Sequence, residues 1–161
     1  MAELNMIIDL ERNDLGRICR PGTIKVTQPR TVDEYPTVYH AVATVEGKLR
    51  ETVCLEQCLR AMFPGGSITG APKLAAIDVI DELEPTARNI YTGSIGLLGI
   101  NGRVCLNIAI RTIIISQGKA YAQTGGGIVY DSDPQFEYEE TLTKARALIA
   151  GIEAVKKMER L

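Results

Sequence analysis

The stretch Pro64-Gly-Gly-Ser-Ile-Thr-Gly-Ala-Pro-Lys73 fixes how the first half of the chain is divided into elements. Residues 51–62 before it carry apolar side chains at helical spacing, and the proline with its two glycines ends that pattern. After it, Pro72 stands where a first helical turn belongs, and apolar residues recur at helical spacing up to Leu83. We therefore predict two helices joined by a glycine-rich connection, with a buried apolar stripe on the second helix.

Outward from this stretch, the first half of the chain predicts one more helix and a small amount of β structure. Residues 2–13 have the apolar spacing of a helix, and residues 23–26 have that of a short strand. Residues 39–49 alternate loosely around Glu46-Gly47, which predicts a hairpin turning at that pair.

The second half predicts three β segments followed by a long helix. The segments are expected at about 92–100, 103–116 and 119–124, separated by the turn pairs Asn101-Gly102 and Gln117-Gly118. Asp133-Pro134 then opens a helix that runs to about Met158. Helices flanking mainly antiparallel strands indicate the α+β class with layered packing.

Composition excludes several classes of protein. The chain has 161 residues, 45% of them hydrophobic, and a net charge of −2, as in one ordinary globular domain. It lacks the basic excess of a nucleic-acid binder, an apolar run of about 18 residues for a membrane span, and a signal-peptide pattern. Four cysteines without a CxxC pair are read as free thiols, so we expect a cytoplasmic protein with no nucleic-acid or membrane partner.

The first residues already have the pattern of a helix interior, with no capping residue before them. The hypothesis from this observation is that residues 1–161 are part of a longer domain that is truncated at the N-terminus.

Two features of the second half have the chemistry of carboxylate binding. Arg111 follows small residues on one face of the segment 103–116, whose other face carries Val104, Leu106, Ile108 and Ile110 toward the core. An arginine there can bind a carboxylate through two parallel hydrogen bonds, although a solvated face or a structural ion pair explains it equally simply. Gly125, Gly126 and Gly127 offer backbone N–H groups to an anion, the alternative being a loop with positive φ angles.

Helix starts supply two further candidates. Ser67 to Lys73 leads into a helix N-terminus, where free N–H groups and the helix dipole favour an anion, or where an ordinary cap would suffice. Glu137 and Glu140 share one face of the last helix. A cation such as Mg²⁺ would remove their repulsion, but acidic residues are also favoured at helix starts without any metal.

His40, the one histidine of the chain, lies in a predicted strand. It is either a structural residue or a proton carrier near neutral pH.

Taken in order, these segments resemble the chorismate-binding family of enzymes, and the resemblance covers nearly the whole chain. The family includes anthranilate synthase component I, aminodeoxychorismate synthase component I, isochorismate synthase and salicylate synthase. The segments that carry the resemblance are Met6-Ile-Ile-Asp-Leu-Glu-Arg-Asn-Asp-Leu-Gly-Arg17, His40, Gly66-Ser-Ile-Thr-Gly-Ala-Pro-Lys73, Ala87-Arg-Asn-Ile-Tyr-Thr-Gly93, Ile108-Ala-Ile-Arg-Thr112, Gly125-Gly-Gly-Ile-Val129 and Glu137-Tyr-Glu-Glu-Thr-Leu-Thr-Lys-Ala-Arg146. The form Phe63-Pro-Gly-Gly-Ser-Ile-Thr-Gly-Ala-Pro-Lys73 is most similar to the aminodeoxychorismate branch.

The resemblance implies a fold and a set of site residues. The fold would be part of a large α/β sandwich. The implied metal site is Mg²⁺ on Glu3, Glu137 and Glu140, and the implied catalytic positions are His40 and Ser67. The residues implied in substrate binding are Tyr91, Arg111, Gly125, Gly126, Gly127 and Lys144.

The resemblance also implies a reaction and partners. In the aminodeoxychorismate branch, ammonia from a glutamine amidotransferase displaces the C4 hydroxyl of chorismate and gives 4-amino-4-deoxychorismate for folate synthesis. The family's upstream Pro-Ile-Lys-Gly-Thr stretch, which holds a nucleophilic lysine, is absent from this chain, so we predict that the chain alone is inactive. The alternatives are an anthranilate synthase, an isochorismate or salicylate synthase relative, or a non-catalytic module. We also expect self-association through faces that the truncation exposes.

Overall fold

The computed structural model describes residues 2–35 and 38–158, which form two compact units with their boundary in the sequence between Pro85 and Thr86. Each unit has its own helices and its own antiparallel strand pairs. This mixture confirms the predicted α+β class.

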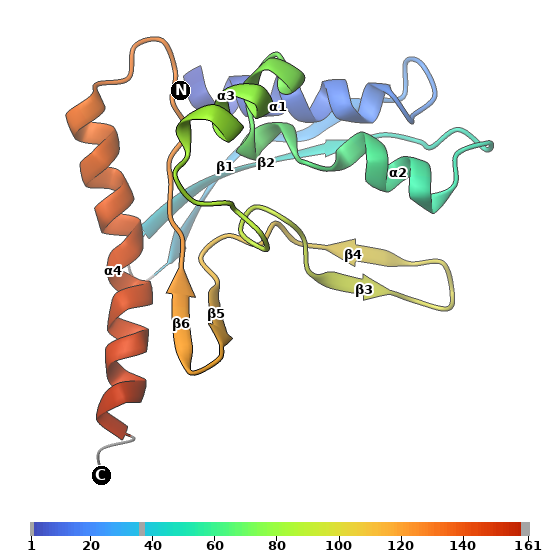
Figure 1. Ribbon diagram of the computed structural model, residues 1–161. Helices are drawn as coiled ribbons and strands as arrows, with labels where there is room; N and C mark the ends of the chain where they lie inside the picture. Colours follow the sequence, from blue (N-terminus) through green and yellow to red (C-terminus); the bar gives the residue numbers. More distant parts are fainter. Residues whose placement is uncertain (1, 36–37, 159–161) are drawn as a thin grey trace. The chain divides into compact units, whose positions relative to one another are not determined.

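The first unit places helices beside one long β hairpin (Figure 1). Its elements are α1 (Ala2–Gly16), β1 (Lys25–Tyr35), β2 (Val38–Glu46), α2 (Leu55–Met62), the 3₁₀ turn η1 (Gly66–Ile68) and α3 (Lys73–Leu83). Strands β1 and β2 pair antiparallel from Lys25 opposite Glu46 to Tyr35 opposite Val38. Helix α1 contacts β2, α2 and η1, which brings the glycine-rich stretch next to the first helix of the chain.

The predicted hairpin at residues 39–49 is wrong in its partner. Strand β2 pairs with β1, which precedes it and is longer than the four-residue strand predicted at 23–26. Residues 48–50 instead run beside the end of α1, because Arg20 N donates to Lys48 O and Arg50 N donates to Ile18 O. The pair Glu46-Gly47 therefore ends a strand but does not turn a hairpin.

The core of the first unit lies where the residues that follow α1 pack against α2. Ile18, Cys19 and Ala61 are buried there, and partly buried apolar side chains surround them. The buried stripe predicted for α3 is wrong along the whole helix: none of its residues is buried, and Leu74 and Leu83 are 79% and 71% exposed. Periodicity locates the apolar face of a helix correctly, but it does not say which element covers that face.

The second unit contains two short hairpins and the long C-terminal helix. Its elements are β3 (Gly96–Leu98), β4 (Val104–Leu106), β5 (Ile113–Ser116), β6 (Lys119–Ala122) and α4 (Pro134–Met158). Strand β3 pairs with β4, β5 pairs with β6, and α4 contacts β6. Gln117 and Gly118 between β5 and β6 have φ values of 50° and 71°, the left-handed pair that a two-residue type I′ turn requires.

The single strand predicted over 103–116 is instead two strands with an irregular segment between them. Arg111 has a φ of 52°, which ends an extended backbone. Ala109 exchanges backbone hydrogen bonds with the segment at residues 92–93 and is fully buried, whereas Ile110 is exposed. The predicted inward face of alternating apolar residues is therefore wrong, since Val104 and Ile110 are both 43% exposed and the buried residue is Ala109 of the opposite face.

Helix α4 begins where the sequence predicts. The Asp133 carboxylate accepts hydrogen bonds from the backbone N–H groups of Gln135 and Phe136, at 2.9 and 3.1 Å, and so satisfies two of the helix's unpaired donors. None of the helices in the described part of the chain combines the length and the apolar character that crossing a bilayer demands.

Candidate functional site

A pocket in the second unit gathers four of the residues that the sequence proposes for substrate binding. Its volume is about 90 Å³. Its lining residues are Tyr91, Ile110, Arg111, Gln123, Thr124, Gly125 and Lys144. Arginine, lysine and tyrosine side chains together supply hydrogen-bond donors and positive charge, so the pocket has the chemistry of an anion site.

Arg111 reaches the pocket from the irregular segment between β4 and β5. Its left-handed backbone costs of order 1–3 kcal/mol in a non-glycine residue, and such strain concentrates at functional sites. The strand that the sequence predicts through this position would have placed Arg111 on a flat face. The break in the backbone places it at the edge of a pocket.

Tyr91 and Gly125 lie close to each other in the lining of the pocket. A Cβ atom added at Gly125 would lie 3.0 Å from the Tyr91 hydroxyl oxygen, so a larger side chain would displace that hydroxyl. The Arg88 guanidinium lies 6.0 Å from the centroid of the Tyr91 ring. Close packing against Tyr91 therefore explains the glycine at position 125. The alternative raised by the sequence, a positive φ angle, does not apply to this residue.

Lys144 connects the glycine segment to the acidic face of α4. Its Nζ atom donates to the Gly125 carbonyl at 3.4 Å and forms an ion pair with Glu140 at 2.5 Å, one helical turn away. A Cβ atom at Gly126 would lie 3.3 Å from Glu137 Oε2 and 3.8 Å from Lys144 Nζ. Gly125 and Gly126 thus allow the chain to pass directly over this face of α4.

Glu137 and Glu140 are the two carboxylates of the proposed metal set whose side chains are described. Glu137 accepts a hydrogen bond from the Ser132 hydroxyl at 2.6 Å, and Glu140 pairs with Lys144. Over residues 2–35 and 38–158 the side chains form no group of three or more acids, histidines or cysteines near enough to share an ion. Two carboxylates still fit Mg²⁺, because this ion is commonly held by one or two carboxylates together with substrate oxygens and water.

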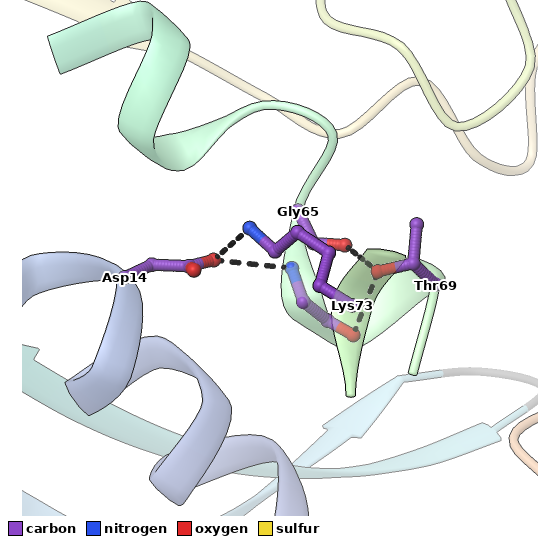
Figure 2. A network of polar contacts seen from close by, with 5 residues as sticks. Asp14, Gly65, Thr69 and Lys73 are labelled. Carbon is purple, nitrogen blue, oxygen red and sulfur yellow. Dashed lines mark hydrogen bonds and ion pairs between the residues drawn. The ribbon is translucent and has the colours of Figure 1, made fainter. Parts of the chain in front are cut away.

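In the first unit, Ser67 lies in a network anchored on α1. Asp14, whose side chain is 5% exposed, pairs with Lys73 Nζ at 2.7 Å and accepts a hydrogen bond from Gly66 N at 3.3 Å (Figure 2). The Thr69 hydroxyl donates to the Gly65 carbonyl at 2.8 Å and closes the turn from its other side. The anion that Lys73 meets is therefore a carboxylate of the protein itself, which differs from the anion site that the sequence predicts at this helix start.

Glu11, one turn before Asp14 on α1, holds Ser67 directly. Burial raises the pKa of the Glu11 carboxyl, while hydrogen bonds from the side chain and backbone of Ser67 oppose that rise. Sequence reasoning missed both acids of α1. Their three-residue spacing puts them on one helix face, but spacing alone does not distinguish that face from a solvated one.

Two predicted site residues cannot be placed by their side chains. Glu3 lies in α1, and His40 lies in β2 opposite Asp33, but the side chains of both lie outside the described part of the structure. The remaining candidates form two groups, with Ser67 in the first unit and the pocket and acidic residues in the second.

Residues 1–150 match the model of the chorismate binding enzyme family, and the chain belongs to that family. It is 49% identical to an anthranilate synthase component 1 of Haloarcula marismortui over 152 residues, 94% of this chain and 31% of that protein. It is 47% identical to the aminodeoxychorismate synthase component 1 of Salmonella typhimurium, again over 94% of this chain and over 34% of that protein. The chain therefore spans about a third of the curated relatives that it matches.

A solved structure agrees with this assignment. The crystal structure of anthranilate synthase component I from Streptococcus pneumoniae matches with a TM-score of 0.82 at 43% identity, and the match covers 90% of this chain and 33% of that one. The sequence identity to the anthranilate synthase relative and to the aminodeoxychorismate synthase relative is nearly equal. The comparisons therefore establish a chorismate-utilising family and leave the product open.

Proposed function

We propose that this chain supplies the carboxylate-binding part of an aminating chorismate enzyme, the aminodeoxychorismate synthase component I. The observation that carries the proposal is that Arg111, Tyr91, Lys144 and Gly125 line one and the same pocket. These residues are far apart in the sequence, and each has the chemistry to hold a carboxylate.

The size of the pocket defines what it holds. Sites for whole drug-sized ligands measure roughly 300–1,000 Å³, whereas this pocket measures about 90 Å³. It therefore accepts one carboxylate arm of chorismate, and the ring extends beyond it. Arg111 provides two parallel donors, Lys144 provides a point charge, and the Tyr91 hydroxyl provides a third donor.

We further propose that Mg²⁺ binds to Glu137 and Glu140, joined by Glu3. The ion would neutralise part of the substrate's charge and assist the departure of the C4 hydroxyl. In this scheme His40 and Ser67 lie near the ring. Gly126 and Gly127 contribute backbone N–H groups, and Lys144 neutralises Glu140 until the metal is present.

The proposed product is 4-amino-4-deoxychorismate, made for folate synthesis with ammonia from a glutamine amidotransferase partner in the cytoplasm. Support for this branch comes from the form Phe63-Pro-Gly-Gly-Ser-Ile-Thr-Gly-Ala-Pro-Lys73. The alternative product is anthranilate, because relatives of that name are as similar. We propose that the chain by itself binds chorismate without turnover and self-associates through its exposed apolar faces.

Titration calorimetry with chorismate, with and without Mg²⁺, tests the binding proposal. We expect binding that Mg²⁺ strengthens and no product after incubation with ammonia. Absence of metal-dependent binding would favour a non-catalytic module. A chimera that joins the preceding part of the Salmonella typhimurium relative to this chain tests the branch, with 4-amino-4-deoxychorismate as the expected product and anthranilate as the contrary one.

A further inference from the structure

Ser132 lies beside the proposed metal face in a second hollow of the same unit. This hollow measures about 310 Å³, and Gly126, Ser132, Glu137 and Thr141 are among the residues that line it. Ser132 is partly buried and precedes α4 by two residues. None of the carboxylate or metal roles proposed above involves it.

The hydroxyl of Ser132 has a defined orientation. Its oxygen accepts a hydrogen bond from Val129 N at 3.0 Å, and its proton is donated to Glu137 Oε1 at 2.6 Å. Ser132 N also donates to the Val129 carbonyl at 3.0 Å, which closes the turn that carries the hydroxyl. A short O–H···O⁻ bond of this kind is among the stronger hydrogen bonds in proteins.

The other oxygen of Glu137 faces the glycine segment. Oε2 lies 3.3 Å from the position that a Cβ atom of Gly126 would occupy. The backbone of Glu137 is fixed as well, because its N–H donates to the Asp133 carbonyl at 3.0 Å. One carboxylate oxygen is therefore held by Ser132, and the other is presented toward the segment proposed to bind substrate.

We infer that Ser132 is a positioning residue that sets the orientation of the Glu137 carboxylate for its cation and substrate. The inference rests on the proposed function of Glu137. Without the hydroxyl, Glu137 would sample other rotamers, and binding would have to order it again. Partners that orient metal-binding carboxylates are commonly worth 10- to 100-fold in metal affinity.

The contrasting role for Ser132 is purely structural, as the residue that closes the turn before α4. Ser132→Ala, Ser132→Thr, Glu137→Gln and the double variant Ser132→Ala/Glu137→Gln separate the two roles. Ser94→Ala is the matched control, because the Ser94 hydroxyl also donates a short hydrogen bond in this unit, to the Asn107 carbonyl at 2.7 Å. The first readout is the Mg²⁺ concentration at which the affinity for chorismate, measured by calorimetry, reaches half of its maximum. The second is the urea concentration at the midpoint of unfolding.

We expect Ser132→Ala to raise the half-maximal Mg²⁺ concentration about tenfold. Ser132→Thr, which keeps a hydroxyl, and Ser94→Ala should both leave this concentration at the value of the unmodified chain. In the Glu137→Gln background, Ser132→Ala should add nothing to the Mg²⁺ requirement, because the serine acts through that carboxylate. If Ser132→Ala changes the urea midpoint but not the Mg²⁺ requirement, the positioning role is overturned and the proposed function stands. If the unmodified chain shows no Mg²⁺-dependent chorismate binding, the proposed function is overturned and the positioning role falls with it.

Discussion

At the scale of single residues, the polar contacts that shape the first unit are made by α1. Asp14 and Lys73 are only 5% and 18% exposed in their side chains, unlike the exposed pair of Asp9 and Arg12 on the same helix. Buried charges are costly unless they are paired, so the Asp14–Lys73 contact constrains the glycine-rich turn that carries Ser67. In the sequence, Asp14 and Lys73 are 59 residues apart, and no local pattern signals that their side chains pair.

Replacing Asp14 should destabilise the chain strongly. Asp14→Ala leaves Lys73 partly buried without its partner, and we expect the free energy of unfolding to fall by about 3 kcal/mol. Asp9→Ala is the control, because its exposed pair should contribute about 0.5 kcal/mol or less. Urea unfolding measures both, and equal losses would contradict the role given to Asp14.

Glu11 should make stability depend on pH. Burial raises its pKa above the ordinary value of 4.5, so the folded chain binds this proton more tightly than the unfolded chain does. Its contribution to stability is therefore fully present below the unfolded-state pKa and is lost as pH rises through the folded-state pKa.

Glu11→Gln removes that titration. We expect the variant to gain stability relative to the unmodified chain as pH rises from about 4 to 7, as measured by urea unfolding at several pH values. If the stability of Glu11→Gln relative to the unmodified chain stays constant or falls as pH rises over this range, the raised pKa of Glu11 is contradicted.

At the scale of elements, local signals predicted boundaries better than partners. Asp133-Pro134 marked the start of α4, and Gln117-Gly118 marked the turn between β5 and β6, because capping and turn chemistry act within a few residues. The strand predicted over 103–116 failed because its alternation continues through the break at Arg111. Just before that break, Ala109 exchanges hydrogen bonds with residues 92–93, a contact that a local pattern cannot reveal.

The Asp133 cap of α4 should contribute measurably to the free energy of unfolding. Asp133→Ala removes the acceptor of two backbone N–H groups, and we expect the free energy of unfolding to fall by about 1 kcal/mol. Asp131→Ala, a nearby exposed carboxylate outside the helix, serves as the control and should change stability little. A loss for Asp131→Ala as large as that for Asp133→Ala would contradict the capping role.

At the scale of the whole molecule, the order of the motifs was more informative than any one of them. Individually, the arginine, the glycine run and the acidic pair each had a plain structural explanation. The family match over residues 1–150 and the pocket that joins Tyr91, Arg111, Gly125 and Lys144 give these features a common context. The contacts of Ser132, Glu11 and Asp14 could not be predicted, because each depends on how distant or irregular segments pack.

The central claim is that the pocket of the second unit binds a carboxylate of chorismate, and the most direct test is calorimetry on Arg111→Ala beside Arg103→Ala. Arg103 is exposed next to the turn between β3 and β4 and lies outside the pocket lining, so its loss removes the same charge elsewhere in the unit. We predict that Arg111→Ala weakens chorismate binding by about 10- to 100-fold, as expected when a charged hydrogen bond is lost, and that Arg103→Ala leaves it unchanged. Equal affinity of the two variants for chorismate would contradict the account.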